Sequence, residues 1–147
     1  MSPRARPVLL VEDDPSDQML MREALKGGPG LIELAVVSDG LEALAYLRGQ
    51  APHAGAPRPA FVLLDWRLPG KSGAEVLADI RADASLKALP VLVLTTSASE
   101  EDVGRAYALG ANCFLTKPTG LDNLQTLVRL LEEFWLTHAV LPGPGRR

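Results

Sequence analysis

Short apolar runs alternate along the chain with longer segments in which apolar and polar residues follow a helical period. Five of the runs have the length and composition that are typical of strands, and three of them are apolar nearly throughout. Continuous apolar runs of this kind are typical of parallel strands that are covered on both faces. We therefore predict strands at residues 7–11, 31–37, 60–64, 90–94 and 113–116.

The segments between these runs carry the signals that start and end helices. A first helical segment, 19–26, ends at the sequence GGPG, which is a strong terminator. Ser72 stands three residues before Glu75, which is the spacing of a capping box at a helix start. Two further helices are predicted, one with an acidic first turn that ends at Gly110 and one at about 121–137.

The alternation of strands and helices determines the fold class. Parallel strands that are joined by helices require right-handed crossovers, so we predict an α/β fold with a doubly wound, five-stranded parallel sheet. A chain of 147 residues fits one domain, which we place at residues 7–139. Residues 1–6 and 140–147 are expected to be flexible tails, and residues 49–59 form a loop rich in proline and glycine.

Composition and charge exclude several classes of function. The formal net charge is −3, so the chain lacks the basic character that nucleic acid or an anionic membrane surface attracts. No apolar run approaches the roughly 18–20 residues that a membrane span needs. Cys113 is the one cysteine of the sequence, which excludes an internal disulfide and favours a cytoplasmic location.

Charged and hydroxyl side chains follow the predicted strands at the points where the strands end. Asp13 and Asp14 follow the first strand, Asp65 the third, Thr95 the fourth and Lys117 the fifth. Because ligands of open parallel sheets bind at the carboxyl ends of the strands, we expect these side chains to meet in one shallow pocket. Adjacent carboxylates repel one another, so a cation is expected beside them.

This set of side chains fits the handling of a phosphoryl group. Clustered carboxylate oxygens suit Mg²⁺, and one carboxylate can attack phosphorus to give an aspartyl phosphate. The metal ion and the ammonium group of Lys117 would neutralise charge on the phosphoryl oxygens, which is most of what the protein has to supply. Thr95 would donate a hydrogen bond to a phosphoryl oxygen and so respond to its presence.

Over nearly its whole length the sequence resembles the receiver domain of bacterial two-component response regulators. The resemblance rests on the motifs EDDP, LLDWRLPGKSG and FLTKP, with Thr95 30 residues after Asp65 and Lys117 22 residues after Thr95. It implies the strand order 2-1-3-4-5 of flavodoxin-like folds, a phosphoacceptor at Asp65 and a sensor histidine kinase as the phosphodonor. It also implies that Thr95 is the switch hydroxyl and that Lys117 is the lysine of the site.

The resemblance further implies a set of metal ligands. Asp13 and Asp14 match the acidic pair of the family, with Asp14 as a direct Mg²⁺ ligand, and the backbone carbonyl of Arg67 fills a further position beside Asp65. The sequence departs from the family pattern at the switch aromatic position. This position holds Phe114 rather than tyrosine, so its side chain has no hydroxyl to fix its rotamer.

Other interpretations of the same residues stay open. Asp14 followed by Pro15 also fits a helix N-cap with proline at the first helical position. The sequence GKS at 70–72 resembles the end of a nucleotide-binding loop, but Pro69 removes a backbone donor from it. An enzymatic alternative is a Mg²⁺-dependent phosphohydrolase, which needs a general acid two residues after its nucleophile, where this chain has Arg67. A receiver that acts as a phosphate-independent scaffold is disfavoured, because every charge that the chemistry requires is present.

The last predicted helix carries more apolar residues than one buried face needs. One stripe can cover the sheet, and the surplus fits a partner surface unless the sheet and tail of the same chain bury the whole arc. The candidate interface residues are Leu127, Leu130, Phe134 and Trp135.

The ending EEFWLTHAVLP resembles more specifically the single-domain regulators that serve bacterial and cyanobacterial phytochrome kinases. This resemblance implies a light-regulated kinase as the phosphodonor and a homodimer. No DNA-binding or catalytic domain follows the last helix, so the output is expected to pass through a protein partner or through self-association.

Overall fold

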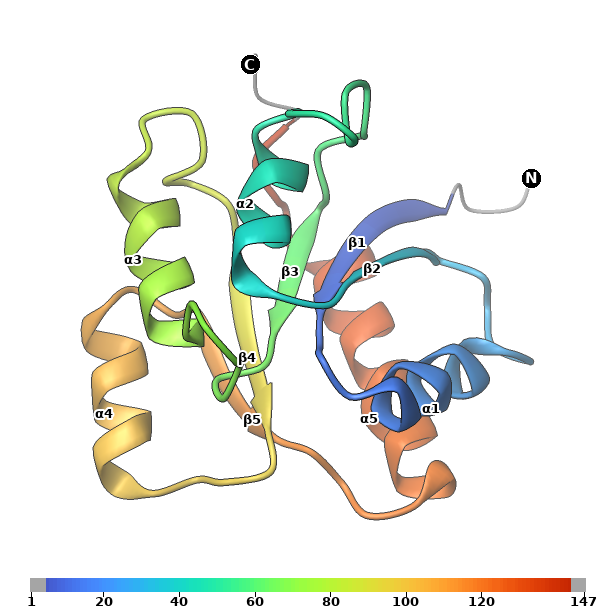
Figure 1. The fold of residues 1–147 in the computed structure, drawn as a ribbon. Coiled ribbons are helices and arrows are strands. Elements are labelled where there is room, and N and C mark those ends of the chain that lie inside the picture. The colour runs from blue at the N-terminus through green and yellow to red at the C-terminus, as the bar shows by residue number, and fades with distance from the viewer. Residues whose placement is uncertain (1–4, 144–147) are drawn as a thin grey trace.

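A computed structural model describes residues 5–143 and shows one five-stranded parallel sheet with helices on both faces (Figure 1). The strand order is β2-β1-β3-β4-β5, which confirms the predicted doubly wound topology. In chain order the elements are β1 (Arg6–Val11), α1 (Pro15–Leu25), β2 (Ile32–Val37), α2 (Gly40–Leu47), β3 (Phe61–Leu64), α3 (Gly73–Ala82), β4 (Val91–Thr95), α4 (Glu100–Ala108), β5 (Cys113–Thr116), α5 (Leu121–Glu133) and a π-helical turn η1 (Phe134–His138).

The most apolar strands lie at the centre of the sheet. Every residue of β3 and β4 is buried, whereas β2 and β5 at the two edges are largely half-buried. A central parallel strand is covered on both faces, so nearly all of its side chains are apolar and no alternation appears in its sequence. This burial is the reason why the strands are visible in the sequence as continuous apolar runs.

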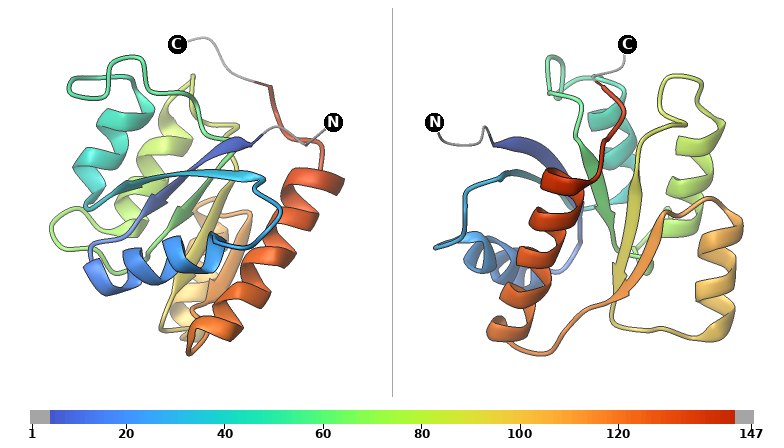
Figure 2. Two further views of the ribbon diagram at one scale, coloured as in Figure 1. Left: turned by 90° about the vertical axis from the view of Figure 1, so that its right-hand side faces the viewer. Right: turned by 180° about the vertical axis from the view of Figure 1, so that it is seen from behind.

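The helices form two layers, one on each face of the sheet. Helices α1 and α5 lie side by side on one face, and α2, α3 and α4 cover the other (Figures 1 and 2). The first layer buries Phe61 and Leu63 of β3, and the second buries Val62 and Leu64 of the same strand. Successive side chains of one strand therefore pack into two separate cores, one on each face of the sheet.

Capping residues determine where the helices begin. The predicted capping box of Ser72 and Glu75 is confirmed at the start of α3. Helix α1 begins at Pro15, earlier than predicted, because Asp14 caps it. Helix α2 has no counterpart among the predicted helices, although Asp39 caps it by accepting a hydrogen bond from the backbone N–H of Glu42 over 2.8 Å.

Residues just outside the predicted domain also take part in the fold. Arg6 already belongs to β1, and Leu141 packs against the core beneath α1 and α5. The outer parts of the predicted tails, residues 1–4 and 144–147, lie outside the described residues. The final helix is present as predicted, but its winding changes after Glu133. Within residues 5–143, no helix has the length and apolar character that crossing a membrane requires.

Candidate functional site

The register of the central strands determines which side chains leave the sheet together. Val11 at the end of β1 pairs with Leu64 at the end of β3, so the next residues, Glu12 and Asp65, leave the same edge of the sheet. The backbone N–H of Asp65 donates to the carbonyl of Val11 over 3.0 Å, which places the two strand ends side by side. The exposed fractions of Glu12 and Asp65 are only 2% and 7%, so two carboxylates lie close together with little access to water.

Asp13 completes a group of three carboxylates. Oxygen atoms of Glu12, Asp13 and Asp65 all lie within 4.8 Å of one another. Asp13 is exposed, so the group opens to solvent on its side. The donors are carboxylate oxygens, which are the ligands that Mg²⁺ prefers, and few such ligands are needed because the ion keeps several waters. The residues therefore fit a divalent cation.

The structure places Asp14 outside this group. Its carboxylate accepts a hydrogen bond from the backbone N–H of Ser16 over 2.8 Å and caps α1, with Pro15 at the first helical position. The predicted acidic pair of Asp13 and Asp14 is therefore replaced by Glu12 and Asp13. The reason is that β1 ends directly before Glu12, which makes Glu12 the first side chain beyond the sheet and leaves Asp14 to the helix. The alternative interpretation of the sequence EDDP, in which Asp14 is a helix N-cap, is therefore confirmed.

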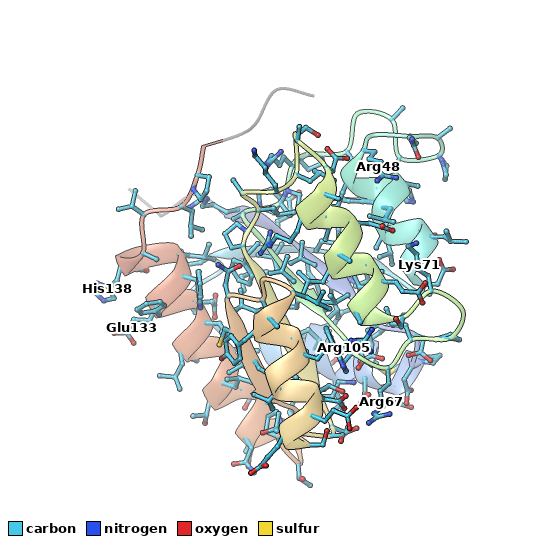
Figure 3. The ribbon with its side chains drawn as sticks, turned by 90° about the vertical axis from the view of Figure 1, so that its left-hand side faces the viewer. Arg48, Arg67, Lys71, Arg105, Glu133 and His138 are labelled. Carbon is cyan, nitrogen blue, oxygen red and sulfur yellow. The ribbon has the colours of Figure 1, made fainter. Side chains whose placement is uncertain are left out.

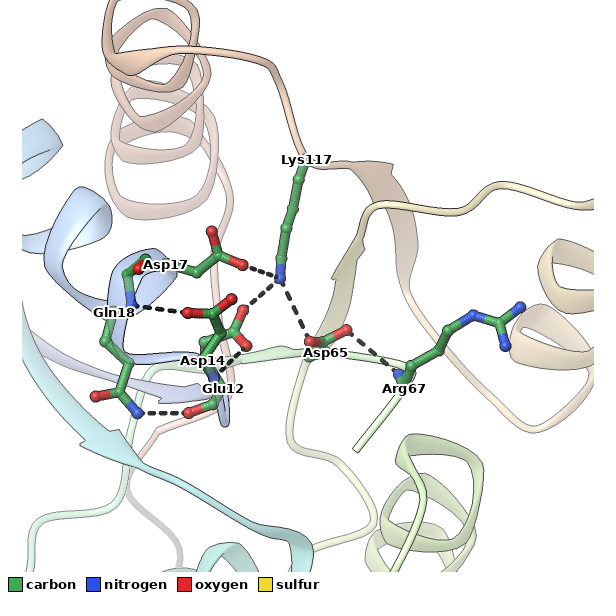
Figure 4. Close-up of polar contacts among 8 residues, drawn as sticks. Glu12, Asp14, Asp17, Gln18, Asp65, Arg67 and Lys117 are labelled. Carbon is green, nitrogen blue, oxygen red and sulfur yellow. Dashed lines mark hydrogen bonds and ion pairs between the residues drawn. The ribbon is translucent and has the colours of Figure 1, made fainter. Parts of the chain in front are cut away.

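Lys117 follows β5 and extends its ammonium group into the acidic group (Figure 4). Its Nζ donates to the carboxylates of Glu12, of Asp17 over 3.0 Å and of Asp65 over 3.3 Å. Three acceptors, one just after β1, one just after β3 and one in α1, thus take all three N–H bonds of the ammonium. Asp17 was not among the predicted site residues, because in the sequence it resembles any acidic residue in the first turn of a helix.

The electrostatics of this group are strongly perturbed. Burial raises the pKa of Glu12 to about 7, although hydrogen bonds from Lys117 and from the backbone of Asp14 act in the opposite direction. Burial acts to lower the pKa of Lys117, but its hydrogen bonds to Glu12 and Asp17 raise this pKa instead. The lysine is therefore charged at every physiological pH, and Glu12 titrates near neutrality. Carboxyl groups with such raised pKa values are typical of functional sites.

Asp65 is held from two sides. Its Oδ1 accepts a hydrogen bond from the backbone N–H of Arg67 over 3.3 Å, and its Oδ2 accepts the bond from Lys117. The side chain of Arg67 points away and forms an ion pair of 2.9 Å with Asp102 in the first turn of α4 (Figures 3 and 4). A hollow on this side is lined by Asp13, Arg67 and Asp102 among other residues. The carboxylate of Asp65 is thus oriented by the protein, and the hollow lies beside its neighbours Asp13 and Arg67.

Thr95 and Phe114 lie on the neighbouring strands β4 and β5. Thr95 is buried at the end of β4, and its backbone carbonyl accepts a hydrogen bond from the N–H of Lys117 over 2.8 Å. Phe114 is half-buried and packs against the core beneath α2, α3 and α4. Its backbone N–H donates to the hydroxyl group of Tyr107 in α4 over 3.1 Å. The hydroxyl group of Tyr107 in α4 therefore accepts a hydrogen bond from the backbone of Phe114, whose own side chain has no hydroxyl group.

The candidate interface residues at the end of the chain divide into two sets. Leu130 and Phe134 are 58% and 57% exposed. Leu127 and Trp135 are half-buried, and the ring of Trp135 lies 6.1 Å from that of Phe61 in the core. Of the four candidate residues, Leu130 and Phe134 are therefore the two that form an exposed apolar surface.

The comparisons with known proteins agree with this geometry. The sequence profile of the response regulator receiver domain matches residues 8–129. The response regulator Rcp1 of Synechocystis sp. is 46% identical over 136 residues, which cover 92% of each chain.

Two solved structures are similar over nearly their whole length. The phosphorylated cyanobacterial phytochrome response regulator RcpA is 45% identical with a TM-score of 0.88, over 95% of this chain and 100% of that one. The Mn²⁺-bound form of response regulator Rcp1 is 45% identical with a TM-score of 0.85, over 94% of this chain and 99% of that one.

Proposed function

The chain belongs to the response regulator receiver domain family of two-component signalling, and on this premise we propose that Asp65 accepts a phosphoryl group from the phosphohistidine of a sensor histidine kinase. The observation that supports the proposal best is the convergence of Glu12, Asp13 and Lys117 on the buried carboxylate of Asp65. These residues come from the ends of three strands, and no simpler structural role explains why so many charges meet there.

The chemistry follows from the contacts of Asp65. One of its carboxylate oxygens forms a bond to phosphorus while the bond between phosphorus and the histidine nitrogen breaks, and the nitrogen keeps the electron pair. Lys117 lies against Asp65 Oδ2, where its ammonium group meets the negative charge of the phosphoryl oxygens. The backbone N–H of Arg67 holds the other carboxylate oxygen and so orients the attacking group.

We propose that Glu12, Asp13 and Asp65 hold a divalent cation, Mg²⁺ in the cell, with the backbone carbonyl of Arg67 as a further ligand. When bound, such an ion neutralises charge on the phosphoryl oxygens. The group of three carboxylates supports this assignment, as does the Mn²⁺-bound form of Rcp1. Asp14 has no part in it, because its carboxylate caps α1.

We propose that Thr95 and Phe114 transmit the phosphorylated state. Thr95 moves toward the phosphoryl group, and Phe114 repacks in the space that this movement opens, which shifts an equilibrium between two arrangements of α4, β5 and α5. The hydrogen bond from Phe114 to Tyr107 supports this route, since it couples the backbone of β5 to α4.

The pathway is proposed from the relatives. Because the similar solved structures include a phytochrome response regulator, we propose a phytochrome-type histidine kinase as the phosphodonor and the cytoplasm as the place of action. The downstream target is a protein or a second copy of the chain. Turnover as a phosphohydrolase is disfavoured, because Arg67 stands at the position of the general acid and pairs with Asp102. Multiple turnovers on phosphate esters would favour the hydrolase instead.

A homodimer is proposed through the exposed apolar surface of Leu130 and Phe134. Glu133 at the end of α5 and His138 at the end of η1 lie beside this surface and line a hollow together with it (Figure 3). Phe134→Glu should give monomers in sedimentation experiments while leaving the fold intact, because this side chain is exposed. Trp135→Glu is a poorer test, because Trp135 packs on Phe61. A wild type that is already monomeric at high micromolar concentration would refute the dimer.

The decisive experiment for the phosphoacceptor is phosphotransfer from candidate kinases, followed by intact-mass measurement. Wild type should gain one phosphoryl group, Asp65→Asn should gain none, and Asp79→Asn should behave as wild type because that carboxylate pairs with Lys71 outside the site. Tryptic mapping that located the label on another residue would refute the proposal. Lys117→Ala should retain most of the Mg²⁺ affinity but lose the response of α4 and β5 to phosphorylation in NMR spectra. A loss of metal affinity in this variant would contradict the separate role of Lys117.

A further inference from the structure

The contact between Lys117 and Asp17 has no part in the proposed transfer of the phosphoryl group to Asp65. Glu12 and Asp65 belong to the metal-binding group, whereas Asp17 lies in the first turn of α1, on the other side of the ammonium group from Asp65 (Figure 4). The distance from Nζ is 3.0 Å to Asp17 and 3.3 Å to Asp65. The side chain of Asp17 is 32% exposed, so its charge is only partly screened by water.

An acidic residue in the first turn of a helix needs no function, since the helix dipole alone favours it there. Asp17 does more than this, because its contact joins two segments that are 100 residues apart in the chain. It also takes the last free donor of Lys117, because Glu12 and Asp65 take the other two. A phosphoryl oxygen that approaches the ammonium must therefore share or replace an acceptor that is already in place.

We propose that Asp17 is a positioning residue that acts through Lys117: it holds the ammonium group toward α1 while Asp65 is unmodified, and it competes with the phosphoryl group for the same donors. This inference rests on the proposed function, because it presupposes a phosphoryl group on Asp65. The charge of Asp17 acts in opposite directions on the two kinds of ligand. It disfavours the anionic phosphoryl group and favours a divalent cation in the neighbouring carboxylate group.

The variant Asp17→Asn isolates this charge, because asparagine keeps the size of the side chain and an acceptor oxygen for Lys117. Removing a partly exposed charge that lies 3.0 Å from the ammonium group should change each affinity by about two- to fivefold. We expect the affinity for beryllofluoride at saturating Mg²⁺ to rise by this factor. The affinity for Mg²⁺ alone should fall by a similar factor. A purely structural role of Asp17 would instead lower both affinities together.

The test measures Mg²⁺ binding by calorimetry and beryllofluoride binding by NMR, with circular dichroism as a check of the fold. Asp17→Glu retains the charge and should lie near wild type. Glu23→Gln makes the same change of net charge on the same helix, but Glu23 pairs with Lys26 rather than with Lys117, so both affinities of this variant should equal those of wild type. Should Asp17→Asn fold poorly, Asp17→Ser gives the same comparison.

Each outcome decides one question. Opposite shifts in the Asp17→Asn variant support the inference. Unchanged affinities, or a parallel loss of both, overturn it while leaving the proposed function intact. A wild type that binds neither Mg²⁺ nor beryllofluoride refutes the proposed function itself, and with it the premise of the role of Asp17.

Discussion

The approach of α3 to the loop after β3 gives a prediction whose size can be worked out from the structure. Gly73 is the first residue of α3, and its backbone N–H donates to the carbonyl of Trp66 over 3.1 Å. A Cβ atom at Gly73 would lie 2.6 Å from the backbone oxygen of Asp65 and 2.7 Å from Cα of Trp66. Both obstacles are backbone atoms, so a change of rotamer cannot remove them.

The magnitude for Gly73→Ala follows from these distances. Carbon atoms in ordinary contact are about 3.5–4.0 Å apart, so the helix or the loop must shift by about 1 Å. Overpacking of this kind costs about 1–3 kcal/mol of the free energy of unfolding. For a chain of this length the midpoint of thermal unfolding should fall by about 3–10 °C. Because the displaced backbone carries Asp65, the rate of phosphorylation should fall as well.

Gly104→Ala is the matched control. Gly104 lies inside α4, and among the described residues no atom beyond the backbone of its own helix lies within 4 Å of the position that its Cβ would occupy. Alanine there should raise the free energy of unfolding by about 0.5–1 kcal/mol, since glycine is a poor helix former. Both variants are measured by calorimetry and by urea unfolding. A Gly73→Ala protein with the stability and the phosphorylation rate of wild type would show that this close approach does not constrain the loop.

The remaining predictions concern the metal, the pH and the buried charge of α5. Asp13→Asn should lower the Mg²⁺ affinity about tenfold or more in calorimetry. Asp14→Asn keeps the helix cap and should change the Mg²⁺ affinity little, so equal losses of affinity in the two variants would contradict the ligand assignment. Because the pKa of Glu12 is raised to about 7, the Mg²⁺ affinity should fall as the pH drops below about 7, and Glu12→Gln should flatten this dependence. The raised pKa of Glu12 also affects the stability of the metal-free protein. Its contribution to the free energy of unfolding is complete below the usual carboxyl pKa and is lost as the pH rises through 7, which urea unfolding at pH 5 and pH 8 can check. Glu132→Ala should cost about 1–3 kcal/mol in urea unfolding, because the buried carboxylate of Glu132 accepts hydrogen bonds from Arg129 and from the backbone N–H of Leu31, which would lose this acceptor; the neighbouring exposed Glu133→Ala should cost about 0.5 kcal/mol or less, and equal effects would refute the importance of burial.

Parts of the fold and the site could be predicted because their physical cause lies within a few residues. The central strands are buried on both faces, so β3 and β4 stand out as apolar runs without any knowledge of their neighbours. The capping box joins Ser72 to Glu75 three residues later, so it is visible in the sequence alone, and this prediction is confirmed. Helix α2 is short and apolar on most sides, which weakened its helical period, and its cap at Asp39 was the only clear signal.

The sequence by itself determined that Asp65, Thr95 and Lys117 follow apolar runs, and parallel strands must deliver such residues to one edge of the sheet. Only the tertiary structure decided which neighbouring acids join them, because a shift of one residue at the end of β1 moves a side chain from the sheet edge to the cap of α1. The tertiary structure therefore puts Glu12 in the group of carboxylates in place of Asp14, which caps α1.

The same holds for contacts between distant segments. Asp17 reaches Lys117 only because α1 and the end of β5 come together in space, across 100 residues of chain, and no local pattern records such a contact. Likewise, the sequence showed a surplus of apolar residues at the end of the chain. The rotation of α5 and η1 against the sheet then decided that Trp135 packs on the core while Phe134 faces solvent, since a helix can turn only one of its faces inward.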